Sequence, residues 1–145
     1  MASTPQFGAT AVYAYNTGAI TAANTAMDGT GTVVFLQTNT SGTAADLLIG
    51  TGGAFIDFVQ INARGTNVAT ALRLFSNANA TNATAANNDL LADVTCPATT
   101  ASNVAGLAPV VISLKRWFPA NTKFFVTIGT AVAAGFSVTM HGSQM

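Results

Sequence analysis

Charged side chains are scarce in this sequence of 145 residues. Lys, Arg, Asp and Glu together make up 7% of the chain, against about 25% in typical soluble domains. Glutamate is absent, and the five aspartates balance two lysines and three arginines, so the formal net charge is zero at pH 7. Because net charge keeps free proteins apart in solution, a neutral surface rich in Thr, Asn, Ser, Gly and Ala favours association with neighbours.

The scarcity of basic residues argues against a nucleic-acid partner. The segment LKRW, residues 114–117, holds the only two adjacent bases, and a phosphate backbone needs a larger basic patch. Long apolar runs are also missing: none approaches the 18 residues that a membrane-spanning helix requires. The start, MASTPQFGAT, has no base before an apolar stretch, so we expect no signal peptide. We therefore expect neither nucleic acid nor membrane as a partner.

Cysteine and histidine occur once each, as Cys96 and His141. A single thiol cannot form an internal disulfide, and one residue of each type does not make a transition-metal site. The two are the only candidate pair of nucleophile and base. Cys96, before Pro97, is typical of a small buried residue at a strand end, and His141 falls on the polar side of the last predicted strand. We expect no catalytic residue, no metal site and no cofactor.

Asp57 falls on a predicted strand, on the same side as Phe55, Val59 and Ile61, which we expect to face the core. A carboxylate on such a face needs a partner. We predict a structural ion pair between Asp57 and Arg73, with Arg64 as the other possible base, across neighbouring strands. The rival interpretation is a catalytic carboxylate.

Short segments rich in β-branched and aromatic residues, separated by turn residues, predict an all-β protein. The candidate strands are residues 9–15, 31–39, 54–63, 68–76, 89–95, 109–115, 122–130 and 134–142. The last two are predicted to form a closing hairpin, and residues 38–46 a loop. The connection 96–108 is long enough to cross between sheets. We predict an antiparallel two-sheet sandwich, jelly-roll-like, of about eight strands.

The first 30 residues are small, polar and dotted with glycine, and their large side chains are sparse. We predict an N-terminal arm over residues 1–30, with one possible strand, before a β-sandwich domain over residues 31–145. Phe7, Tyr13 and Tyr15 are the candidate anchors by which such an arm would dock on a neighbour. The alternative is an unstructured terminus.

Three segments resemble a family of small virion proteins of tailed bacteriophages, known as cement, decoration or minor structural proteins. They are GAFIDFVQINARGTNVATALRLFSNA, NNDLLADVTCPATT and FFVTIGTAVAAGFSVTMHG. The resemblance spans roughly residues 50–142, and RGTNVATALRLF and GTAVAAGFSVT are its most specific parts. Family members often continue with a short Gly-rich tail, whereas this chain has HGSQM.

The resemblance implies a β-sandwich that binds the outer surface of the capsid after synthesis in the host cytoplasm. Its partners would be the major capsid protein and further copies of itself, as homotrimers that bridge neighbouring capsid subunits. The arm, with Phe7, Tyr13 and Tyr15, would lie across a neighbouring subunit. Two alternatives stay open: a tail, neck or baseplate component, and a carbohydrate-binding module for host attachment that uses Trp117 and Phe118. We do not expect an enzyme.

Overall fold

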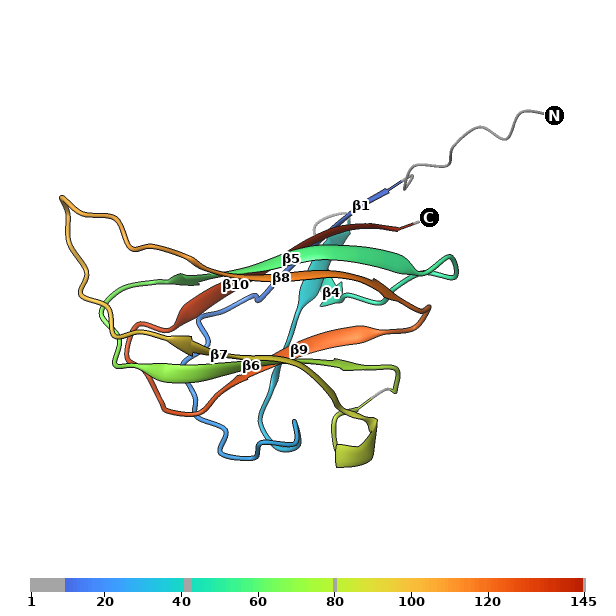
Figure 1. Cartoon of the computed structure of the whole chain (residues 1–145), viewed down its shortest axis with the longest axis horizontal. Coiled ribbons are helices and arrows are strands. Elements are labelled where there is room, and N and C mark those ends of the chain that lie inside the picture. Colours follow the sequence, from blue (N-terminus) through green and yellow to red (C-terminus); the bar gives the residue numbers. More distant parts are fainter. Residues whose placement is uncertain (1–9, 41–42, 80, 145) are drawn as a thin grey trace.

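The computed structural model describes residues 10–40, 43–79 and 81–144, and it shows two antiparallel β-sheets stacked in two layers (Figure 1). In spatial order, the six-stranded sheet comprises β4 (Thr43–Asp46), β3 (Gln37–Thr40), β1 (Thr10–Tyr15), β10 (Phe136–Gln144), β5 (Ala54–Ala63) and β8 (Val110–Phe118). The four-stranded sheet comprises β2 (Val34–Phe35), β9 (Lys123–Ile128), β6 (Thr70–Asn77) and β7 (Asp89–Cys96). The predicted all-β sandwich is confirmed, with ten strands among the described residues where about eight were predicted.

Two short strands account for the difference in number. The predicted strand 31–39 divides at Leu36, which is fully buried, so that β2 joins one sheet and β3 the other. The predicted loop 38–46 contains most of β3 and all of β4, which pair with each other. Helical structure among the described residues is limited to one 3-10 turn, Ala85–Asn87. As predicted, the chain after Cys96 crosses from the four-stranded to the six-stranded sheet (Figure 1).

The predicted closing hairpin is wrong. β9 pairs with β2 and β6, whereas β10 pairs with β1 and β5, so the two strands lie in different sheets. Both strands alternate as expected, and the residues that they turn inward are fully buried: Val126 and Ile128 on β9, Val138 and Met140 on β10. An alternating pattern shows that a strand has one buried face. It does not show which sheet that strand joins.

The core lies between the facing sides of the two sheets. Its largest fully buried side chains are Phe124, Phe136, Leu36, Ile49, Ile56, Ile61, Leu72, Leu74, Ile128 and Met140. Burial of such a side chain contributes on the order of 1.5–3 kcal/mol each. Because these side chains lie between the sheets, the residues on the two outer faces of the sandwich do not belong to this core.

The segment between β1 and β2, residues 16–33, which we call the strap, first runs beside β10, where Ile20 pairs with Phe136. It then passes to the outer side of the four-stranded sheet, where a Cβ atom at Gly29 would lie 3.1 Å from the Phe75 ring. The backbone amide of Asn24 in the strap donates a hydrogen bond to the carbonyl of Ile128 in β9 at 2.7 Å. Beneath the strap, Phe75 and Phe125 stack with their ring centroids 5.2 Å apart and are almost fully buried. They alternate with the core-facing residues of β6 and β9. Gly29 of the strap lies against Phe75, and the Phe35 ring of β2 lies 5.3 Å from that of Phe125, so both contribute to shielding the pair from water.

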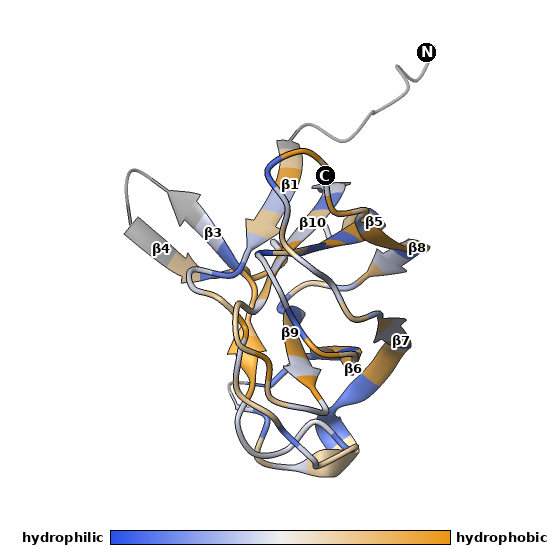
Figure 2. Cartoon of the chain, turned by 90° about the vertical axis from the view of Figure 1, so that its left-hand side faces the viewer, coloured by the Kyte–Doolittle hydropathy of each residue, from blue (hydrophilic) through white to orange (hydrophobic). Residues whose placement is uncertain are grey.

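From Thr10 onward, the residues that we assigned to an N-terminal arm are part of the sandwich. β1 lies inside the six-stranded sheet and pairs along its whole length with β10, a strand from the other end of the sequence (Figures 1 and 2). Tyr13 and Tyr15 belong to β1. Phe7 lies outside the described residues.

Candidate interaction surface

Aromatic side chains gather on the outer face of the six-stranded sheet. In the register of the sheet, Tyr13 lies opposite His141, and His141 lies opposite Phe58. The His141 ring stacks on Phe58 at 4.6 Å between centroids and meets the edge of Tyr13 at 5.1 Å. Tyr15 adds a fourth ring, 5.9 Å from Tyr13. We call these four residues the aromatic cluster.

Further exposed apolar side chains extend this face toward the edge strand β8. Phe55 and Trp117 are paired in the β5·β8 register and are 38% and 45% exposed. Val111 on β8 is also exposed. Single exposed apolar side chains are common on proteins, but a contiguous set across several strands is typical of an interaction surface.

A β-bulge at Asp57 places the Phe55 and Phe58 rings on this outer face. Gly142 of β10 pairs with Ile56 and His141 pairs with Phe58, so Asp57 is an extra residue in β5. The bulge reverses the alternation, because Ile56 and Val59, three positions apart, are both fully buried. Our prediction that Phe55 and Asp57 face the core is therefore wrong, since both are exposed.

The irregularity continues into β8. Between the residues that pair with Ile56 and Phe58, β8 has two residues, Leu114 and Lys115. Lys115 adopts a left-handed backbone conformation, with φ of 44°, which is uncommon for a residue with a side chain. A bulge and a lysine at an edge strand hinder pairing with a further strand. The geometry therefore favours contact through the face of this sheet over contact through its β8 edge.

Gly142 allows β10 to approach β5 closely at the bulge. A Cβ atom at this position would overlap the carbonyl oxygen of Phe55 and lie 3.0 Å from the Cα of Ile56. A shallow hollow of about 350 Å³ lies here, lined by Phe55, Asp57, His141, Gly142 and Ser143. We call it the Asp57 hollow.

The predicted ion pair between Asp57 and Arg73 is not formed. Arg73 on β6 lies opposite Asp93 on β7, and its Nε is 3.3 Å from the Asp93 carboxylate. Asp57 lies on β5, in the other sheet. We expected β5 and β6 to be neighbours because they are consecutive in the sequence, but the chain changes sheets between them. Arg64, the other base considered, is exposed at the turn after β5 and forms no ion pair within the described residues.

The polar residues of this face do not form a hydrogen-bonded triad within the described residues. Asp57, His141 and Ser143 are of the types found in hydrolytic triads, but in the described structure no hydrogen bond joins them, and the His141 ring stacks on Phe58. Cys96 is buried at the end of β7, in the other sheet, and burial raises the pKa of its thiol to about 11. No group of three His, Cys, Asp or Glu that could hold a metal occurs among the residues described.

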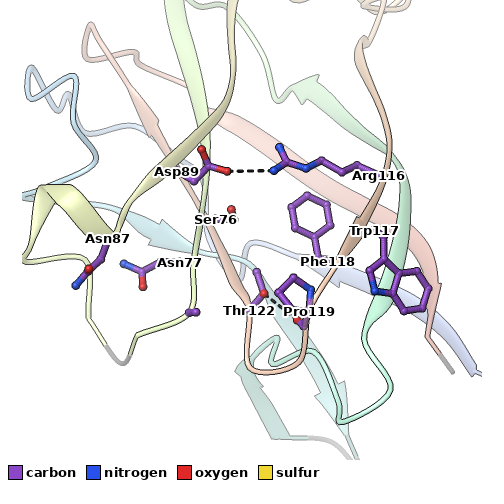
Figure 3. A pocket seen from close by; sticks show the side chains of 10 residues that line it. Ser76, Asn77, Asn87, Asp89, Arg116, Trp117, Phe118, Pro119 and Thr122 are labelled. Atoms are coloured by element: carbon purple, nitrogen blue, oxygen red, sulfur yellow. Dashed lines mark hydrogen bonds and ion pairs between the residues drawn. The ribbon is translucent and has the colours of Figure 1, made fainter.

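A second hollow, of about 290 Å³, lies where the edges of the two sheets approach each other (Figure 3). Arg116 of β8 spans it to reach Asp89 of β7 at 3.5 Å, and both side chains are exposed. Trp117 points away from this ion pair (Figure 3), while Phe118, the next residue on the strand, is buried in the core. Trp117 and Phe118 therefore do not form the single exposed platform that the carbohydrate-binding alternative assumed.

Sequence reasoning found the aromatic residues of β1 and His141 but assigned them no common surface. It placed Phe58 on the outer side of its strand but assigned Phe55 to the core, because regular alternation does not reveal a bulge. The signal that could have pointed to the bulge is Gly142, the glycine at the end of the predicted strand 134–142.

Comparison with protein-family models, curated proteins and solved structures finds no match to this chain. Within residues 10–40, 43–79 and 81–144, the structure has no helix long and apolar enough to cross a membrane.

Proposed function

We propose that this chain is a non-enzymatic structural protein of a bacteriophage virion. It is a capsid decoration (cement) protein that binds the outer capsid surface and bridges neighbouring major capsid subunits. The observation that carries the proposal is the outer face of the six-stranded sheet, which is broad, aromatic and nearly without charge. The strap passes to the opposite face of the sandwich and lies against Phe75 there, whereas this face has no cover among the described residues.

The composition of the face is that of a protein-binding surface. Aromatic residues are enriched at the centres of protein interfaces and charged residues are depleted there. The aromatic cluster, with Phe55, Trp117 and Val111, supplies the apolar area, and Asp57 is the carboxylate beside it. A protein held in a shell at high local concentration does not depend on net charge for its solubility. The low charge of the whole chain is consistent with this role.

The position of β1 changes how we expect Tyr13 and Tyr15 to contact the capsid. Tyr13 and Tyr15 lie in the sheet, so they would contact the capsid as part of its face and not through a detached arm. The resemblance to cement proteins adds homotrimers over the junctions between capsid subunits to the proposal. In such an arrangement, each copy presents the aromatic cluster to the shell and holds adjacent subunits together against internal pressure.

The test is to mix the purified protein with expanded, empty capsids of the bacteriophage that encodes it. We expect the protein to co-sediment with the capsids and to give density on the outer capsid lattice in a cryo-EM reconstruction. The double variant Tyr13→Ala/Phe58→Ala should bind at least tenfold more weakly. The matched control is Val68→Ala/Val104→Ala, which truncates exposed residues outside this face and should bind as the wild type does.

Two results would contradict the proposal. Density on the tail, neck or baseplate in place of the capsid would make the chain a different virion component. Failure of the folded wild-type protein to bind capsids, with a clean monomer in gel filtration, would remove the capsid role.

A further inference from the structure

We infer that the Asp57 hollow receives the guanidinium group of an arginine from the protein against which the six-stranded sheet packs. This inference rests on the proposed function and names the chemistry of the partner at one point of the interface. It follows from the charges of the chain, the position of Asp57 on the docking face, and the residues that line the hollow.

Four of the five aspartates have a partner within the chain. Asp46 lies 3.6 Å from the amine of Lys123, Asp89 pairs with Arg116, and Asp93 pairs with Arg73. Asp28 accepts hydrogen bonds from the backbone and hydroxyl groups of Thr30. Asp57 forms neither an ion pair nor a side-chain hydrogen bond within the described residues. Lys115, in the adjoining bulge of β8, makes no ion pair with it.

A lone carboxylate is harmless while the face is in water, but contact with a partner removes that water. Burial of an unpaired charge costs several kcal/mol. Asp57 lies beside His141 of the aromatic cluster, so a protein that covers the cluster also covers Asp57. The partner must therefore supply a cation or strong hydrogen-bond donors at this point. Without them, the buried and unpaired Asp57 carboxylate would weaken the interface.

The residues that line the hollow favour a guanidinium over an ammonium group. Its lining combines the Phe55 and His141 rings with the Asp57 carboxylate and the Ser143 hydroxyl. A planar guanidinium can stack on an aromatic face while it donates two parallel hydrogen bonds to a carboxylate, which a lysine amine cannot do. A cation against an aromatic ring adds about 0.5–2 kcal/mol when water is excluded.

A saccharide is the competing ligand for a hollow of this kind, because sugars also stack on rings and bind carboxylates. The hollow offers a saccharide few polar side chains beyond Asp57 and Ser143. The unpaired negative charge is its main feature, and that charge is complemented by a cation and not by a neutral sugar. We therefore argue for arginine, and the experiment below includes a saccharide as an opposing result.

The first experiment titrates empty capsids with the wild-type protein and with Asp57→Asn. We expect the substitution to weaken binding at least tenfold, because the partner's arginine loses its charge partner inside the interface. The control is Asp89→Asn, which removes an exposed carboxylate outside this face and should change binding by less than twofold. If Asp57→Asn binds as the wild type does while Tyr13→Ala/Phe58→Ala fails, the hollow inference is wrong and the proposed function stands.

The second experiment does not depend on the capsid. Amide NMR signals of the ¹⁵N-labelled protein are followed during titration with a blocked Gly-Arg-Gly peptide, with the Gly-citrulline-Gly peptide and with maltotriose. We expect the arginine peptide to shift the amides of Phe55, Gly142 and Ser143, and we expect the shifts to vanish in Asp57→Asn. Equal shifts with citrulline, shifts with maltotriose alone, or unchanged shifts in Asp57→Asn would each overturn the inference.

Discussion

At the scale of single residues, asparagine has a role inside this protein as well as on its surface. Asn16, Asn24 and Asn67 are buried, and the side-chain amide of each donates to a backbone carbonyl group. The Oδ1 of Asn67 accepts hydrogen bonds from the amides of Ala134 and Gly135 at 2.9 Å, and its Nδ2 donates to the carbonyl of Gly135 at 3.0 Å. These contacts fix the loop that carries the chain from β9 to β10.

We predict that Asn67→Ala lowers the free energy of unfolding by about 2–4 kcal/mol, because buried backbone groups lose their partners. Urea denaturation followed by circular dichroism measures the change. Asn103→Ala is the control, since Asn103 is exposed, and it should have an effect of less than about 0.5 kcal/mol. Equal effects of the two substitutions would show that the hydrogen bonds of Asn67 do not stabilise the loop.

Gly142→Ala should destabilise the protein by about 1–3 kcal/mol, since the added methyl group overlaps the backbone of β5 and the bulge must shift. Thermal unfolding gives the measurement. Gly106→Ala is the matched control, because a Cβ atom there has no neighbour within 4 Å. A wild-type melting temperature for Gly142→Ala would contradict the close approach of β10 to β5.

Cys96 should be unreactive in the folded protein. Burial disfavours the thiolate and raises the thiol pKa from its ordinary value of 9.0 to about 11. Iodoacetamide at pH 8 should label Cys96 only after urea is added, which mass spectrometry detects. Because the folded pKa is the higher one, this group stabilises the fold below about pH 9, and that contribution is lost as the pH rises toward 11. Rapid labelling without urea would contradict the burial of Cys96.

At the scale of strands, two ion pairs between strands differ in their surroundings. The pair between Arg73 and Asp93 joins β6 to β7, with side-chain exposures of 10% and 38%. The pair between Arg116 and Asp89 joins β8 to β7, with exposures of 57% and 60%. In the first pair, the Arg73 Nη1 is buried without a hydrogen-bond partner in the described structure, so the Asp93 carboxylate is its main compensation.

We predict that Asp93→Asn costs about 2 kcal/mol of unfolding free energy, because it leaves the buried guanidinium without a counter-charge. Asp89→Asn should cost less than about 0.5 kcal/mol, since exposed pairs contribute little. Denaturant titration of the two variants at the same pH compares them directly. An Asp93→Asn protein as stable as the wild type would mean that Arg73 has access to water.

The positions of the strands in the sequence were more predictable than the pairing of the strands within the sheets. The segment 54–63 was predicted with its observed bounds, because it is rich in β-branched and aromatic residues and has turn residues on both sides. The pairing was not predictable: 31–39 divides between sheets at Leu36, and β9 and β10 separate, because a buried face fits either layer. The candidate surface was hidden for a different reason, since a bulge at Asp57 leaves no mark in an alternating pattern.

At the scale of the whole molecule, the two outer faces of the sandwich are unlike. The strap and Phe35 contribute to shielding Phe75 and Phe125 on the four-stranded sheet. On the six-stranded sheet, no described segment covers the aromatic cluster, and Tyr13, Phe55 and Trp117 are exposed. With a net charge of zero, two molecules have no overall electrostatic repulsion to keep their exposed six-stranded faces apart.

The free protein should therefore self-associate through this face at high concentration. We predict that Tyr13→Lys/Val111→Lys reduces self-association in static light scattering. Val68→Lys/Val104→Lys adds the same charge to exposed positions elsewhere, and it should reduce self-association less. Equal effects of the two pairs would assign the association to net charge alone.

The pairing of β1 with β10 also has a consequence for the timing of folding. β10 joins β1 to β5, yet the ribosome makes it after every other described strand. Until it emerges, the sheet exists in two separate parts, β4-β3-β1 and β5-β8, each with an open edge. A nascent chain in this condition has unpaired strand edges that favour aggregation. Its long-range contacts are still to form, and this slows folding. Of the described strands, the last to be synthesised is thus the one that joins the two parts of the sheet, and a chain stalled before it would expose both parts to aggregation.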